Sequence, residues 1–195
     1  GSVAGAICSV AIDDGDVVIK TIRDENPRGI CGTGVVEVTA ELVKNGIVDE
    51  TGLLDDDYFD NGFFLAKTKD GKDITFSQKD IREIQLAKAA IRAGIETLLL
   101  RYGITAGQVA KVYLAGGFGY QLDVKKAVLI GLLPETLSDR IEAVGNSSLA
   151  VAVKYLQNRD NSDLKKIVSV SKEVTLANDA DFNAFYMGAM MFTKK

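Results

Sequence analysis

One stretch decides the fold expected of this chain: Val112-Tyr113-Leu114-Ala115-Gly116-Gly117-Phe118-Gly119. Four apolar residues run directly into two adjacent glycines, and a third glycine follows Phe118. This order predicts a buried strand that breaks into a turn at its C-terminal end. In open α/β sheets ligands bind beyond the carboxyl ends of strands, and glycine lets the backbone approach a flat group. The stretch therefore predicts a strand-end site for a nucleotide or a similar planar group, with a plain tight turn as the structural alternative.

The composition is that of an ordinary globular domain. With 195 residues, 47% of them hydrophobic and 26% charged, the chain suits one domain. The net charge of −4 gives no electrostatic reason to expect nucleic acid or an anionic membrane as a partner. No apolar run approaches the ~20 residues of a membrane span, and no signal-peptide pattern opens the chain, so a cytoplasmic location is expected.

The chain contains no histidine, which removes the commonest general base and the usual zinc ligand. Two cysteines, Cys8 and Cys31, are too few for a disulfide framework or a four-thiolate cluster, and Cys31 is expected to be a small buried residue. The acidic cluster at residues 55–57, with Asp60, is expected to be solvated. We therefore expect no metal ligands in this chain, and the catalytic residues remain unknown.

Strands alternate with helices along the sequence, which indicates an α/β fold in one compact unit. Two apolar runs at residues 5–12 and 17–22 flank an Asp-Gly turn and predict a hairpin. Residues 47–76 are expected to be an irregular insertion, and two further strands are expected at residues 141–144 and 174–176. Helices are expected at residues 34–44, 77–102, 124–130, 145–156, 162–169 and 179–192.

The clearest helix follows Ser77, which is expected to be its N-cap, with Asp80 in the first turn and a stop at Gly103. A strip of small residues on this helix, including Ala90 and Gly94, would let a neighbouring element pack closely. The residues expected to face the core are Ile81, Ile84, Ala87, Ile91, Ile95 and Leu98.

Glycine-bearing junctions between strands and helices occur three times, at residues 29–34, 115–119 and 145–148. The free N–H groups at the start of a helix are natural hosts for phosphate. Gly32-Thr33-Gly34 would offer backbone donors and the Thr33 hydroxyl, although it is neither a P-loop nor the dinucleotide-binding fingerprint. A tight turn into a helix is the alternative here, and Arg28 and Lys125 are nearby cations that could meet a phosphate.

Several segments, in this order, resemble the C-terminal domain of the reductive activators of corrinoid proteins, and the resemblance runs from about Gly5 to the C-terminus. The segments are Gly29-Ile30-Cys31-Gly32-Thr33-Gly34, the helix at residues 77–94, the stretch at residues 112–119, Ile130-Gly131-Leu132-Leu133-Pro134 and Val144-Gly145-Asn146-Ser147-Ser148-Leu149.

The resemblance implies a ribonuclease-H-like lobe of the actin, sugar-kinase and heat-shock ATPase superfamily, with a mixed sheet flanked by helices. Such activators use ATP, with Mg²⁺, to help reduce cob(II)alamin to cob(I)alamin in the corrinoid protein of a methyltransferase system. By this resemblance the adenosine-contacting turn is Ala115, Gly116, Gly117, Phe118 and Gly119. Gly32, Thr33 and Gly34 would form a phosphate-side loop, and Gly145 and Asn146 would start the helix that connects the lobes.

The chain departs from the family pattern in two ways. The four cysteines of a [2Fe-2S] cluster are absent, so the cluster is expected only in an N-terminal domain of full-length members. The Asp-Ile-Gly-Thr-type phosphate segment is missing too, so residues 1–195 are expected to be the C-terminal ATPase-like domain of a longer chain. Alone, this domain is expected to bind ATP weakly or not at all and to be inactive.

Two other functions remain open at this stage. The first is a docking or dimerisation module without nucleotide chemistry, built on the small-residue strip and the apolar C-terminal residues Phe185, Met187, Met190, Met191 and Phe192. The second is a small-molecule kinase, for which Asp123 is the candidate carboxylate, although helix capping would also explain this residue. The partner expected is a corrinoid protein, with a homodimer as a further option.

Overall fold

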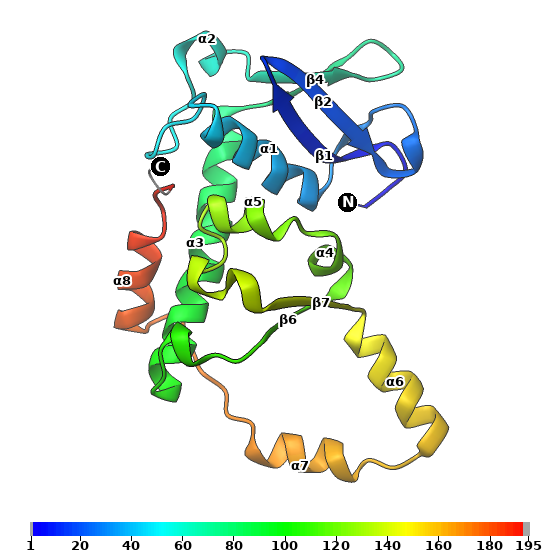
Figure 1. The fold of residues 1–195 in the computed structure, drawn as a ribbon, viewed down its shortest axis with the longest axis vertical. Coiled ribbons are helices and arrows are strands. Elements are labelled where there is room, and N and C mark those ends of the chain that lie inside the picture. The colour runs from blue at the N-terminus through cyan, green and yellow to red at the C-terminus, as the bar shows by residue number, and fades with distance from the viewer. Residues whose placement is uncertain (1, 193–195) are drawn as a thin grey trace.

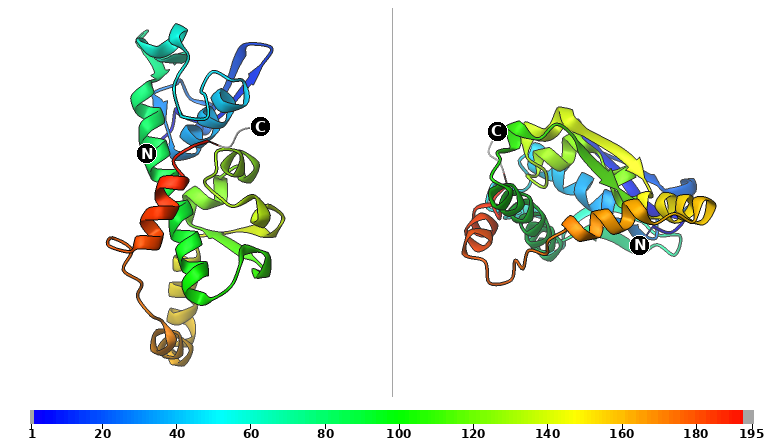
Figure 2. Two further views of the ribbon diagram at one scale, coloured as in Figure 1. Left: turned by 90° about the vertical axis from the view of Figure 1, so that its left-hand side faces the viewer. Right: turned by 90° about the horizontal axis from the view of Figure 1, so that it is seen from below.

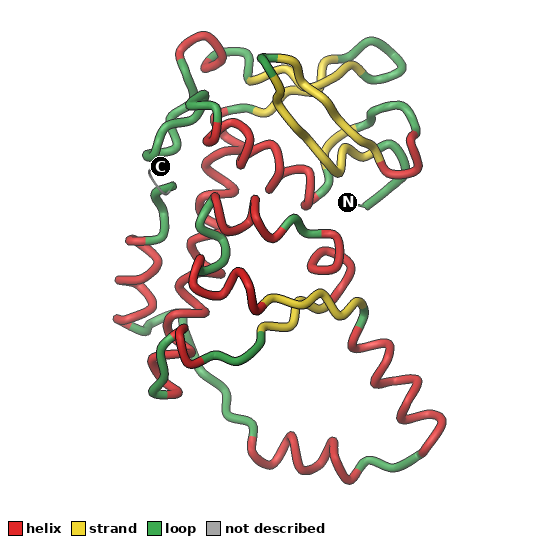
Figure 3. Tube along the Cα trace, viewed as in Figure 1, coloured by secondary structure: helices red, strands yellow, loops and turns green. Residues whose placement is uncertain are grey.

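The structure is a computed structural model that describes residues 2–192. The 25-residue helix α3 (Gln78–Tyr102) runs along the molecule, and the other elements are arranged beside it (Figure 1). Within the described residues the strands form one sheet of three strands and two sheets of two strands. Figure 3 shows these strands gathered in two separate places, with helices between and beyond them.

The N-terminal hairpin is confirmed. Strands β1 (Ala6–Asp13) and β2 (Asp16–Thr21) pair antiparallel across the Asp14-Gly15 turn, with Ile12 opposite Val17. The 3₁₀ helix η1 (Ile22–Asp24) follows, and the short strand β3 (Gly29–Ile30) returns parallel to the start of β1. Helix α1 (Gly32–Lys44) then begins, two residues earlier than the sequence predicted.

Residues 47–76 hold more regular structure than the sequence predicted. They contain the short helix α2 (Asp56–Phe59), capped by Asp55, and the antiparallel strands β4 (Phe63–Lys67) and β5 (Asp73–Phe76). The Asp70-Gly71 turn joins these two strands, and Gly71 has a φ of 79°.

Helix α3 begins and ends where the sequence predicted. The Ser77 side chain accepts the Asp80 N–H, the Asp80 carboxylate accepts the Ser77 N–H, and Gly103 closes the helix in the left-handed conformation. The predicted core stripe is wrong in part, because Ile91 and Leu98 are 48% and 51% exposed. Ala87 is exposed as well, whereas Ile81 is buried as predicted. The other buried positions of this helix are Gln85, Lys88, Ala89, Ala93 and Thr97.

The glycine stretch lies in a strand–helix unit, but its strand is not buried as predicted, because Tyr113 is 60% exposed. Strand β6 (Val112–Ala115) follows the 3₁₀ helix η2 (Ala106–Gln108) and leads directly into helix α4 (Gly116–Gln121), so the turn predicted after Ala115 is the first turn of a helix. Asp123 caps helix α5 (Val124–Leu129) by accepting the Lys126 N–H. After the 3₁₀ helix η3 (Glu135–Arg140), strand β7 (Ile141–Gly145) pairs parallel to β6.

The C-terminal part consists of three helices. Helices α6 (Ser147–Asn158) and α7 (Ser162–Val170) extend away from the β1–β2 hairpin, and residues 148–173 are all exposed (Figures 1 and 2). The strand predicted at residues 174–176 is absent, since this segment has no strand partner in the described structure. Helix α8 (Ala180–Gly188) is shorter than predicted and packs beside α3 (Figure 2).

The hydrophobic core lies between the β1 sheet, α1, the β4–β5 pair, the start of α3 and α5. Its fully buried side chains include Ile7, Val10, Val36, Val38, Leu42, Leu54, Phe76, Ile81 and Ile130. Gly94 is not needed for a close helix contact, because a Cβ there would meet Leu176 at an ordinary 3.9 Å. Across residues 2–192, none of the helices combines the length and apolar character that crossing a membrane requires.

Candidate functional site

The structure brings two of the glycine segments together. Gly32 opens helix α1 directly against the ring of Phe118 in α4, and a Cβ at Gly32 would lie 3.1 Å from that ring. The absence of a side chain at Gly32 therefore permits the contact between the two segments. Phe118 remains 47% exposed, so the junction is open to solvent.

The third glycine segment lies at the same place. Strands β6 and β7 are parallel, and Gly145 is the partner of Ala115 in their register. Their carboxyl ends consequently meet at one edge, which is where α/β sheets bind ligands. Asn146 caps helix α6 at this edge, where its side chain accepts the Leu149 N–H at 3.0 Å. All three glycine junctions found in the sequence thus surround one edge of the β6–β7 pair.

The glycines at this edge have different structural roles. Gly116 and Gly145 have φ of 88° and 69°, a conformation that favours glycine. A Cβ on Gly34 would lie 2.2 Å from the Ile7 carbonyl oxygen, so Gly34 is required by packing alone. Gly117 is different, because its φ is not positive and a Cβ there would meet no atom within 4 Å. At this edge, therefore, neither backbone conformation nor packing explains why position 117 is a glycine.

Thr33 is more enclosed than expected for a phosphate ligand. The residue is buried, and its Oγ1 lies 3.1 Å from the Sγ of Cys31, which is buried as predicted. The hydroxyl is thus already partnered within the chain, and the exposed donors of the loop are backbone groups at Gly32. A role for these residues in nucleotide binding stays a prediction.

Sequence reasoning missed a buried ionic cluster behind the site. Lys126 of α5 donates to the Glu37 carboxylate at 2.9 Å and pairs with Glu41 at 3.1 Å, and both glutamates belong to α1. Lys126 also donates to the Val10 carbonyl at 2.5 Å, while Glu37 accepts the Val10 N–H at 3.0 Å. The cluster ties β1, α1 and α5 together. Its signal in the sequence was the i, i+4 spacing of Glu37 and Glu41 within an otherwise apolar helix.

Within this cluster, opposite charges stabilise the charged forms of their partners. Burial opposes the charged form of Lys126, but hydrogen bonds and the charges of Glu37 and Glu41 raise the pKa of Lys126 above its usual value. Burial likewise opposes the charge of Glu41, and the hydrogen bonds from Lys126 and from the Ile12 N–H hold the pKa of Glu41 below its usual value. Both shifts favour the charged forms of Lys126 and Glu41, and the cluster fixes α1 relative to the segment that follows α4.

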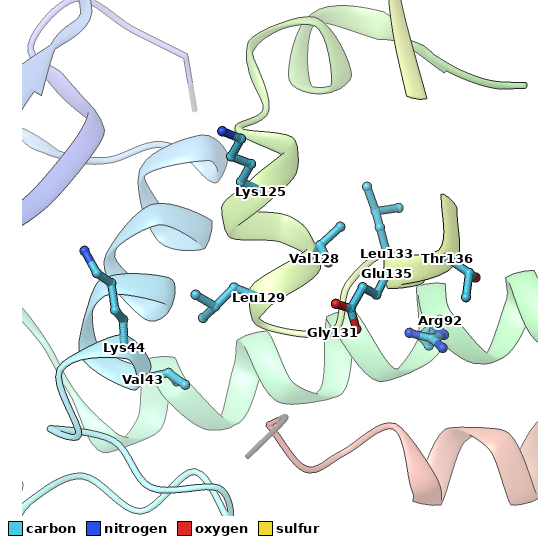
Figure 4. Close-up of a pocket in the computed structure, with 10 residues that line it drawn as sticks. All are labelled: Val43, Lys44, Arg92, Lys125, Val128, Leu129, Gly131, Leu133, Glu135 and Thr136. Carbon is cyan, nitrogen blue, oxygen red and sulfur yellow. The ribbon is translucent and has the colours of Figure 1, made fainter. Parts of the chain in front are cut away.

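A cavity of about 610 Å³ lies between α1, α3 and α5 (Figure 4). Lys125 lines this cavity together with Lys44, Arg92 and Glu135. Arg28, the other cation considered from the sequence, lines a separate hollow with residues of the β4–β5 loop. The structure therefore places Arg28 and Lys125 in different hollows, and neither of these hollows is lined by the glycine segments.

Comparison with known proteins agrees with the sequence resemblance. A family model described as the C-terminal domain of RACo, the ASKHA domain, matches residues 2–195. The corrinoid activation enzyme RamQ of Eubacterium limosum is 32% identical over 208 residues, which cover 96% of this chain and 35% of that protein. The [Co(II) methylated amine-specific corrinoid protein] reductase of Methanosarcina barkeri is 30% identical, with 82% of this chain and 28% of that protein covered.

A solved structure shares the fold. The reductive activator for corrinoid, iron-sulfur protein superposes with a TM-score of 0.89 at 33% identity, over 98% of this chain and 33% of that one. The chain therefore spans about a third of the length of the proteins it matches.

Proposed function

Because the chain belongs to the family of C-terminal ASKHA domains of RACo, we propose that it forms one wall of an ATP site in a reductive activator of a corrinoid protein. The observation that carries this proposal is the meeting of three glycine junctions at the carboxyl ends of β6 and β7. Backbone without side chains at that edge suits a flat base and its sugar. The ATPase fold of the family supports a nucleotide as the ligand.

The proposed contacts follow from the open positions of the site. Gly116 and Gly117 would face the adenosine, because a Cβ at either position would meet no protein atom within 4 Å. Phe118 and Gly32 form the adjoining surface, with the Gly32 backbone toward the phosphates. Asn146 would hold the start of α6 at the edge of the site. The remaining wall, and the ligands of Mg²⁺, would come from other parts of the longer protein.

The role proposed for ATP is conformational. Nothing in the arrangement requires a nucleophile from this domain, and Asp123 is engaged in capping α5. Bound nucleotide would favour one of two domain arrangements through its differential affinity for them. The electron that converts cob(II)alamin to cob(I)alamin would come from a [2Fe-2S] cluster outside this domain, since two cysteines are too few to bind one. The partner is a corrinoid protein, as the names of the relatives specify for those proteins.

Calorimetric titration of ATP-Mg²⁺ tests this proposal. The 195-residue chain should bind weakly or not at all, and a chain extended N-terminally to the length of the relatives should bind ATP. In the extended chain, Gly117→Val should abolish binding, because the new side chain enters the proposed path of the adenosine. Gly188→Val is the matched control, since Gly188 also lies in a helix with no atom within 4 Å of a Cβ.

The outcomes are distinct. Loss of ATP binding in the Gly117→Val variant, with binding retained in Gly188→Val, would support the site. Equal ATP binding by both variants would place the nucleotide elsewhere. Micromolar binding by the 195-residue chain alone would contradict a shared site.

A docking or dimerisation role without nucleotide chemistry is the second candidate. Its support is the apolar surface of α6 and α7, where exposed side chains include Leu149, Leu156, Ile167, Val168 and Val170. Of the C-terminal residues first considered for this role, Phe192 is buried, whereas Met187 and Met191 are 69% and 49% exposed. Absence of ATP binding in the extended chain, with concentration-dependent association by sedimentation, would favour this candidate.

A further inference from the structure

The chain's two cysteines lie at the end of one strand pair. Ala6 and Ile7 of β1 pair in parallel register with Gly29 and Ile30 of β3. The Cys31 N–H donates to the Ile7 carbonyl at 3.0 Å, which is the last hydrogen bond of this ladder. Cys8 and Cys31 are therefore the residues that directly follow its last pair, Cys8 within β1 and Cys31 at the start of α1.

Residues that follow the last pair of a strand ladder lie close enough for a disulfide. Neighbouring strands lie about 4.8 Å apart, and disulfides join residues whose Cα atoms are about 4.4–6.8 Å apart. Cys8 lies at an irregularity of the β1–β2 register between Ile7 and Ser9, so the regular alternation of side chains along β1 is interrupted at this residue. Both cysteines are free thiols in this structure.

The two thiols differ in access. Cys8 is partly exposed, and its Sγ donates a weak hydrogen bond to the Lys20 carbonyl at 3.4 Å. Cys31 is 3% exposed and contacts Thr33. Burial raises the pKa of the Cys8 thiol, and the neighbouring Cys31 adds to this effect, so the two groups are close enough to interact. Cys8 is therefore the thiol that a reagent in solution can reach, and Cys31 is the enclosed neighbour.

We infer that Cys8 and Cys31 are a modification site at which an organic disulfide such as oxidised glutathione closes an intramolecular disulfide bond. In the first step the Cys8 thiolate, after losing its proton to solvent, attacks one sulfur of the reagent and releases one thiolate. In the second step the Cys31 thiolate attacks the Cys8 sulfur of the mixed disulfide and releases the second thiolate. Two protein thiols are oxidised, one reagent disulfide is reduced to two thiols, and the two protons pass to solvent and the released thiolates.

The bond would join β1 to the residue that precedes Gly32. It would fix the start of α1 covalently where a short strand of two residues now holds it. This assignment does not depend on nucleotide binding, because it rests only on the register of β1 and β3 and on the two thiols.

The test is a mass measurement. The 195-residue chain is incubated with oxidised glutathione, then unfolded in the presence of an alkylating reagent and digested with trypsin. The expected product has lost two hydrogen atoms, carries no alkyl group, and yields peptide 1–20 joined to peptide 29–44, since trypsin cleaves after Lys20, Arg28 and Lys44. Reduction before alkylation should restore two alkylated cysteines.

A matched control keeps two thiols but removes their register. In the double variant Cys8→Ser/Ala11→Cys the thiol moves to an exposed position three residues along β1, about 10 Å from its original place. This variant should retain glutathione as a mixed disulfide on the thiol introduced at position 11, and it should form no cross-linked peptide.

Three results would overturn the inference. The first is recovery of both cysteines of the unmodified chain in alkylated form after the incubation. The second is a stable mixed disulfide on Cys8, or a disulfide between two chains, in place of the internal bond. The third is cross-linking of the control variant at the same rate as the parent chain.

Discussion

A buried lysine offers the sharpest test of the packing between α3 and α8. Lys88 is 1% exposed, and its Nζ donates to the carbonyl oxygens of Ala189 and Met191 at 2.6 and 2.7 Å. The same ammonium lies 4.9 Å from the centre of the Phe192 ring. Burial, assisted by the charge of Arg92, lowers the pKa of Lys88 from 10.5 to about 8. We consider the substitution Lys88→Met, which keeps a long flexible side chain and removes the titrating group.

The sign of the effect follows from the direction of the shift. Between pH 8 and pH 10.5 the unfolded chain holds a proton on Lys88 that the folded chain has released. Stability therefore rises with pH in this window, and well below pH 8 both states are protonated and the term becomes constant. For these two pKa values, linkage gives the parent chain a gain of about 1 kcal/mol between pH 7 and pH 9.

Urea unfolding followed by circular dichroism at pH 7, 8 and 9 measures this term. The parent chain should gain about 1 kcal/mol relative to Lys88→Met across this range. The comparison with the variant cancels the contribution of every other group that titrates between pH 7 and pH 9, because those groups are common to both chains. A difference between the two chains that is the same at all three pH values would refute the reasoning, as would a difference of opposite sign.

Three further predictions concern the site and its support. Lys126→Met should cost about 3–5 kcal/mol in urea unfolding, because it removes the cation that pairs with the buried Glu37 and leaves Glu41 with Lys44 alone; a loss below about 1 kcal/mol would contradict the role given to the cluster. Gly34→Ala should destabilise the fold by at least about 1–3 kcal/mol, because its Cβ would overlap the Ile7 carbonyl, whereas Gly117→Ala should change the melting temperature little. Cys8 should react with iodoacetamide more slowly than an exposed cysteine at pH 8, because its raised pKa leaves less thiolate, and the rates should converge as the pH rises; equal rates at pH 8 would contradict the shift.

Local signals in the sequence predicted the local structure well. Ser77, Asp80 and Gly103 delimit α3 because a cap and its partner lie within a few residues of each other. Asp123 caps α5 for the same reason. The sequence predicted that the glycine junctions form a site at strand ends. It did not predict the contact between Gly32 and Phe118, because these two residues lie far apart in the chain.

Contacts between distant segments explain what the sequence did not predict. A lysine on a helix is usually solvated, and the burial of Lys88 depends on carbonyl groups about a hundred residues later. Glu37 and Glu41 are buried because Lys126 comes from another helix. Ile91 and Leu98 have the spacing of a core stripe, but both side chains stay exposed. The residues directly after α8 contact Gln85 and Lys88 instead.

The length of α3 has a mechanical consequence. Its 25 residues make a rod of about 37 Å whose one end is fixed by the Ser77 cap beside β5 and whose other end reaches η2, just before β6. A tilt of about 5° at the capped end would carry the far end through about 3 Å, the length of one hydrogen bond. The helix thus has the proportions of a lever, which converts an angular change at the cap into a displacement of the segment that leads into the start of β6.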